Sequence, residues 1–175
     1  FRIDRGGSLR VDRGSWSAVN KTDGPITFFY MPVANHNNRS AAQLSVRDIR
    51  FEPKAANHKV IDCAWGSGSI TFDDCADLSS LQYDAAMEFN LHRYVGQRHS
   101  GFGTGPMVRY RNHQGAGYHL YEGPKQERGN IVYDGCYFYR GGSGQKAKNA
   151  LRWSSGEPQY RFQDCDNVDN QSNLS

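Results

Sequence analysis

Two aspartates and four arginines stand at equivalent places in short segments that alternate apolar and polar residues. The aspartates are Asp73, in ITFDDC, and Asp134, in IVYDGC. The arginines of this set are Arg47, Arg109, Arg111 and Arg161. Glycoside hydrolases commonly use two carboxylates, and the planar arginine fork binds carboxylate or sulfate groups in a bidentate manner. Asp73 and Asp134 are therefore candidate catalytic residues, and the arginines are candidate ligand-binding residues.

Aromatic side chains close to the second aspartate could stack on sugar rings. Tyr137 and Tyr139 follow Asp134 closely, and they join the candidate ligand-binding residues. Further aromatics expected at the surface are Tyr94, Tyr118 and Tyr121. An alternative interpretation of the charged residues stays open, because alternating Asp and Arg on a sheet also form an ordinary charge ladder between neighbouring strands.

The segments that must position these residues are copies of one short pattern. Apolar residues stand five and three positions before an anchor residue, and Asp, Asn or Gly immediately precedes the anchor. The fuller copies are 44–49, 70–75, 108–113, 131–136 and 160–165. Asp, Asn and Gly adopt the left-handed backbone conformation most readily. The pattern therefore predicts a sharp corner before each anchor, which lets both apolar positions and the anchor face one interior.

The spacing of the anchors predicts how these segments are arranged. The anchors Ile49, Cys75, His113, Cys136 and Cys165 follow one another at intervals of 26, 38, 23 and 29 residues. Intervals in the twenties are typical of one coil of a solenoid. We expect an all-β fold, a single-stranded parallel β-helix, with an antiparallel β-sandwich as the alternative. Stacked strands lie about 4.8 Å apart, so Asp73 and Asp134, with one coil between them, should be roughly 9–10 Å apart.

The long interval predicts an insertion at about 76–105 within coils that span 41–175. Residues 1–40 are expected to form opening strands or a neck. Inside the insertion, the spacing of the apolar residues predicts a short helix over 81–95. Two histidines there, His92 and His99, could serve a lyase with their arginine neighbours, although a solvated surface role is the default for them.

Composition limits the classes of ligand and partner. The net charge of +3 is compatible with an anionic glycan as partner and is weak evidence for binding to nucleic acid. No apolar run approaches the roughly 18 residues of a membrane span, so no membrane insertion is expected. No CxxC pair occurs and the six histidines complete no zinc spacing, so neither a metal nor a cofactor is predicted. The four cysteines allow two disulfides or four buried thiols, and three of the four are anchors, which favours packing.

The segments LSVRDIRF, ITFDDC, IVYDGCYF and YRFQDC resemble coils of phage tailspike proteins and of the wider pectate-lyase-like family of right-handed parallel β-helices. The resemblance lies at the level of the fold and matches no catalytic motif of the family. It implies a homotrimer in the tail of a phage virion that binds, and often cuts, a bacterial surface polysaccharide. The resemblance leaves open whether this chain is an enzyme. If it is one, a glycoside hydrolase or a polysaccharide lyase is expected. The alternatives are a secreted polysaccharide lyase and a structural virion protein without glycan activity.

Overall fold

Strands are the regular elements of the chain wherever its structure is described. The computed structural model describes residues 1–4, 6–17, 24–32, 42–52, 58–63, 68–77, 92–95, 97–99, 102–104, 107–115, 119–122, 130–138, 151–155 and 159–165. The all-β class predicted from the sequence is confirmed for these residues. Among them there is no helix of the length and apolarity that crossing a lipid bilayer requires.

One parallel sheet is built from the segments that carry the repeated pattern. Its main strands are β1 (Ser8–Ser17), β3 (Ala42–Glu52), β5 (Gly68–Asp73), β10 (Met107–Arg111), β13 (Asn130–Asp134) and β16 (Gln159–Gln163). Short continuations beyond the corners are β6 (Ala76–Asp77), β11 (Gln114–Gly115) and β14 (Tyr137–Phe138). The main strands pair in the order of the sequence, every pair in parallel.

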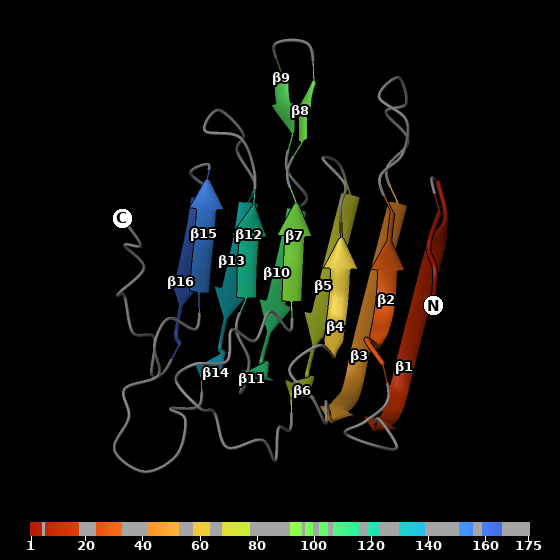
Figure 1. Cartoon of the computed structure of the whole chain (residues 1–175). Helices are drawn as coiled ribbons and strands as arrows, with labels where there is room; N and C mark the ends of the chain where they lie inside the picture. Colours follow the sequence, from red (N-terminus) through yellow and green to blue (C-terminus); the bar gives the residue numbers. More distant parts are fainter. Residues whose placement is uncertain are drawn as a thin grey trace.

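A second parallel sheet faces the first (Figure 1). Its strands are β2 (Thr27–Met31), β4 (Lys59–Cys63), β7 (His92–Val95), β12 (His119–Glu122) and β15 (Leu151–Ser155). Apart from the short continuations and one hairpin, successive strands of the chain alternate between the two sheets, so the main strands of both sheets follow one another in sequence order. A separate antiparallel hairpin, β8 (Gln97–His99) with β9 (Phe102–Thr104), extends beyond the sheets in Figure 1. Parallel pairing throughout both large sheets agrees with the predicted parallel architecture and not with an antiparallel sandwich.

Left-handed corners occur at the residue before each anchor, as the pattern predicted. The positive φ angles are 53° at Asp48, 53° at Asp74, 50° at Asn112, 61° at Gly135 and 50° at Asp164. The anchors Ile49, Cys75, His113 and Cys136 that follow the first four corners are buried. The corners also touch one another across strands, because Asn112 Nδ2 donates a hydrogen bond to Asp74 Oδ1 at 3.0 Å.

The core lies between the two sheets and contains a column of stacked rings. Phe72, Tyr110 and Tyr133 stand three positions before the anchors of β5, β10 and β13, and all three are fully buried. Their ring planes are within 7° of parallel, with centroids 5.1 Å and 5.0 Å apart. Because the strands pair in register, the same pattern position meets itself in each neighbouring strand, and aromatic residues there stack face to face.

One further copy of the pattern, in β1, was not predicted from the sequence. In β1, Leu9 and Val11 pair with the first apolar positions of β3, and Gly14 pairs with the anchor Ile49. The corner residue is Arg13, with φ of 62°. An arginine in place of Asp, Asn or Gly, and a glycine in place of an apolar anchor, hide this copy. β1 therefore continues the first sheet directly from β3.

The predicted helix over 81–95 is wrong at its C-terminal end. His92–Val95 form β7, a central strand of the second sheet, while 81–91 lie outside the described residues. Apolar residues spaced four apart suggested a helix. In β7 the side chains of His92 and Tyr94 are buried and that of Arg93, between them, is only partly so. Such alternation over four residues is too short a signal to compete with the helical spacing.

Candidate functional site

Two rows of side chains follow the outward face of the first sheet. One row lies two positions before the anchors and reads, in sheet order, Asp12, Arg47, Asp73, Arg111, Asp134 and Gln163. The other lies four positions before the anchors and reads Arg10, Ser45, Thr71, Arg109, Val132 and Arg161. The sequence predicted the residues of β3, β5, β10, β13 and β16 in neighbouring strands, and the register places them there, whereas Asp12 and Arg10 of β1 were not predicted. We call both rows together the outer charged face.

The two candidate catalytic aspartates are each paired with an arginine of the strand between them. Arg111 Nε lies 3.6 Å from Asp73 Oδ1, and Arg109 Nη2 lies 3.0 Å from Asp134 Oδ2. The arginine side chains are about half exposed, at 48% and 49%, and the aspartates are 26% and 27% exposed. Two strand spacings separate the aspartate backbones, or roughly 9–10 Å. Opposite charges alternating from strand to strand are the arrangement of a charge ladder.

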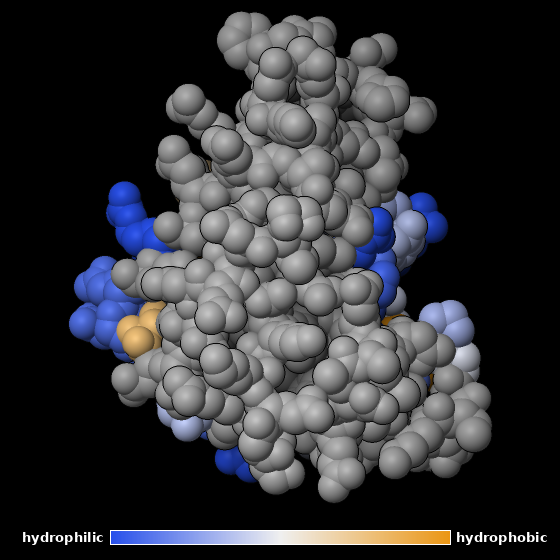
Figure 2. Space-filling model, turned by 60° about the vertical axis from the view of Figure 1, so that its left-hand side comes forward, coloured by the Kyte–Doolittle hydropathy of each residue, from blue (hydrophilic) through white to orange (hydrophobic). Residues whose placement is uncertain are grey.

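The remaining predicted ligand-binding residues are placed as follows. Arg47 and Arg161 are exposed, and neither has an ion-pair partner among the described residues. Tyr137 on β14 is 39% exposed, whereas Tyr139 lies outside the described residues. Tyr94 was expected at the surface and is instead fully buried, which removes it from any sugar-binding face. In Figure 2 the described surface residues are mainly hydrophilic, with a small hydrophobic area at the left of the view.

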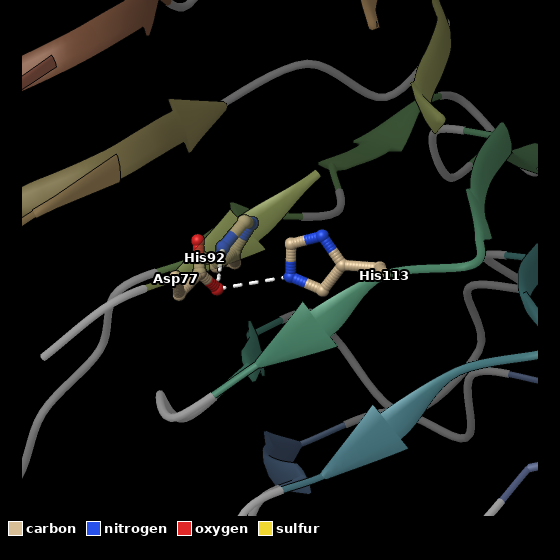
Figure 3. Close-up of side chains that lie close together, drawn as sticks. All are labelled: Asp77, His92 and His113. Carbon is tan, nitrogen blue, oxygen red and sulfur yellow. Dashed lines mark hydrogen bonds and ion pairs between the residues drawn. The ribbon is translucent and has the colours of Figure 1, made fainter. Parts of the chain in front are cut away.

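A cluster of three polar side chains lies inside the protein, where the sequence analysis expected no metal ligands. His92 Nε2 is 2.8 Å from Asp77 Oδ2, and His113 Nε2 is 3.0 Å from the same oxygen. The side chains come from β6, β7 and the corner after β10, and both imidazoles point at the carboxylate (Figure 3). All three residues are buried, with at most 1% of their surface exposed. His92 is therefore not the solvated residue that the sequence suggested.

Two tyrosines extend this buried cluster. The Tyr110 hydroxyl lies 2.9 Å from His92 Nδ1, and the Tyr94 hydroxyl hydrogen-bonds to that of Tyr110. Burial raises the pKa of both tyrosines well above the usual value, so both hydroxyls keep their protons. In a consistent set of hydrogen bonds, Tyr94 donates to Tyr110, Tyr110 donates to His92 Nδ1, and His92 Nε2–H donates to Asp77.

Burial and the histidines act in opposite directions on Asp77. Burial alone would raise the pKa of its carboxyl, but electrostatic attraction and hydrogen bonds from His92 and His113 outweigh burial and lower it. The pKa of His92 is lowered, because burial disfavours the imidazolium more than Asp77 favours it. The cluster therefore holds an ionised Asp77 carboxylate in the apolar interior. A buried charge of this kind is costly unless a partner compensates it.

The three residues of this cluster stand out in the sequence only once the pairing register of the strands is known. Asp77 pairs with Phe51 in the neighbouring strand, and His92 pairs with Ile61. His113 occupies the anchor position that Ile49 and the anchor cysteines hold elsewhere. Asp77 and His92 thus each lie beside a buried apolar residue of a neighbouring strand, although the other neighbour of His92 in the second sheet is His119. The three residues come from three different columns and meet at one point.

The outer charged face and the buried Asp77–His92–His113 cluster are two places in the described part of the chain where side chains with possible chemical roles converge. Comparison with protein-family models, with curated proteins and with solved structures finds no match. The function of either place must therefore be inferred from the chemistry of its own residues.

Proposed function

We propose that the chain forms part of a right-handed parallel β-helix, in which one strand from each sheet makes up a coil. The alternation of successive strands between two parallel sheets supports this architecture, as do the recurrent left-handed corners. Connections between parallel strands of one sheet are right-handed in nearly all proteins, which is the basis for the proposed hand.

We further propose that the outer charged face binds an acidic polysaccharide of a bacterial surface, as the receptor-binding spike of a phage tail. The observation that carries this proposal is the set of exposed arginines on the outward face of in-register parallel strands. Along the row two positions before the anchors, Arg47 and Arg111 stand two strands apart, roughly 9–10 Å. A linear polymer with regularly spaced anionic groups could meet several of them at once. Arg47 stands between Asp12 and Asp73 in its row. Arg47 and Arg161 nevertheless contribute most to this proposal, because neither forms an ion pair with a described residue.

Retention of the protein on immobilised capsule and O-antigen polysaccharides tests the proposal directly. Charge-assisted hydrogen bonds are worth about 1.5–3 kcal/mol, so Arg47→Ala or Arg161→Ala should each weaken binding about tenfold or more. Arg2→Ala is the matched control, because Arg2 is an exposed arginine away from the outer charged face. Equal binding by all three variants, or no binding to any acidic glycan in the panel, would contradict the proposal.

Glycoside hydrolysis by Asp73 and Asp134 is the second candidate function. The separation of their backbones is compatible with the roughly 6.5–9.5 Å between carboxyl groups of inverting enzymes. Their ion pairs with Arg111 and Arg109 already engage both carboxylates, which favours glycan binding by this face over glycan cleavage. New reducing ends that disappear in the Asp73→Asn, Asp134→Asn double variant would establish hydrolysis, and an ultraviolet-absorbing unsaturated product would indicate a lyase. Retention without either product supports binding alone.

A further inference from the structure

We propose that Asp77, His92 and His113 bind a divalent first-row transition metal ion between the two sheets. One ligand atom from each of these residues lies within 4.8 Å of the other two. The three side chains come from separate elements and converge on one point (Figure 3). This site is distinct from the outer charged face and does not depend on glycan binding.

The donor atoms suit such an ion. Two imidazole nitrogens and a carboxylate are ligands of Zn²⁺ and of other first-row divalent metals. Asp77 can offer both carboxylate oxygens, because its Oδ1 is buried and has no hydrogen-bond partner within the described part of the chain. Two imidazoles and one carboxylate make three protein ligands, as in zinc sites with two histidines and one carboxylate.

The hydrogen bonds around His92 suit metal binding through Nε2. To ligate through Nε2, the imidazole must carry its proton on Nδ1. That proton would then be donated to the Tyr110 oxygen 2.9 Å away, and the Tyr110 hydroxyl would turn to donate to Tyr94. A metal-bound histidine usually makes such a second hydrogen bond, which fixes its tautomer and orientation.

The position of the three residues also favours a shared ligand. Each lies beside a buried apolar residue of a neighbouring strand or at an anchor position that is apolar in other copies, and burying each polar group alone would cost stability. The three side chains meet at one place, where the bonds to a metal ion would compensate all of them. Because the site is enclosed between the sheets, the ion would enter while the chain folds, and binding would add to folding stability.

Refolding in the presence of metal tests the inference. The full chain, with any affinity tag removed, is unfolded with a chelator and refolded with Zn²⁺ or Co²⁺ or without metal. After desalting, elemental analysis should find about one ion per chain, Co²⁺ should give visible absorption bands, and Tm should rise by about 5 °C or more. Asp77→Asn should lose the ion.

A pair of conservative variants keeps the test decisive if Asp77→Asn does not fold. Tyr110→Phe removes the hydroxyl beside His92 and should weaken metal binding about 10- to 100-fold. Tyr133→Phe removes a hydroxyl one strand further along the ring column and should bind metal like the unchanged chain. A refolded chain without bound ion would overturn the inference, leaving the cluster as a hydrogen-bonded network only. So would equal metal affinity in Tyr110→Phe and Tyr133→Phe.

Discussion

Left-handed corners govern which residues are tolerated at six equivalent positions of the first sheet. An L-residue with a Cβ atom pays about 1–2 kcal/mol in this conformation, which Asp and Asn reduce through local hydrogen bonds. Gly135 has a second constraint, because a Cβ atom there would lie 2.7 Å from Asn112 Oδ1. The side chain of Asn112 already bonds to Asp74, so it is not free to move without loss.

Replacing Gly135 by alanine should therefore lower the free energy of unfolding by about 1–3 kcal/mol. The measurement is urea denaturation followed by circular dichroism. Asp48→Gly is the matched control at an equivalent corner, where glycine adopts the positive φ without strain, and it should change stability by less than about 1 kcal/mol. A Gly135→Ala chain as stable as the unchanged protein would show that the corner does not constrain this position.

The cysteines should behave as protected thiols. All four are free, three are buried, and Cys165 is partly exposed. Burial raises the pKa of Cys75 to about 12 and that of Cys136 to about 11, so little reactive thiolate forms at pH 8. A thiol reagent should modify Cys165 first in the native protein, and all four cysteines after unfolding without reductant. Fewer than four reactive thiols in the unfolded chain would instead indicate disulfides.

At the scale of the elements, the ring column links three neighbouring strands. Tyr133→Ala removes a fully buried ring from the stack, and a loss of roughly 3–5 kcal/mol is expected. Val132→Ala, at the adjacent outward and partly exposed position, is the control and should cost far less. Denaturant titration of both variants compares them. Similar losses in the two would mean that the column does not dominate the packing of β13.

The ladder on the outer face should contribute little to stability. Arg109 and Asp134 are 49% and 27% exposed, so solvent and salt screen their attraction. A double-mutant cycle with Arg109→Ala and Asp134→Ala should give a coupling energy of about 0.2–1 kcal/mol that falls as salt is added. A larger coupling that salt does not reduce would mean that this pair is shielded from solvent.

The elements also show what sequence can and cannot predict. The strands around Asp74, Asn112 and Gly135 were predictable, because residue types that favour positive φ stand at fixed offsets from apolar residues. β7 was missed since four alternating residues compete poorly with a helical spacing. The buried cluster was missed because its members belong to different columns. Only the register, which places Phe51 beside Asp77 and Ile61 beside His92, makes their polarity exceptional.

For the whole molecule, the proposed tailspike role predicts a homotrimer. Met107 is 64% exposed on the outward side of β10 and is an apolar residue available for contact between copies. Native mass spectrometry should find three times the 19.7 kDa chain mass. Met107→Lys should shift the distribution toward the monomer. A chain that stays monomeric at every concentration tested would argue against the tailspike role, and the glycan-binding measurements would then stand alone.

The identical register of β5, β10, β13 and β16 bears on how such a molecule could change over evolutionary time. The stretch between one left-handed corner and the next, such as 113–135, returns the chain to the same place in the pattern one strand further along. Its loss or duplication would leave the inward and outward assignment of every later residue unchanged. A single recombination event could thus shorten or lengthen the wall by a whole repeat, and with it the length of the outer charged face.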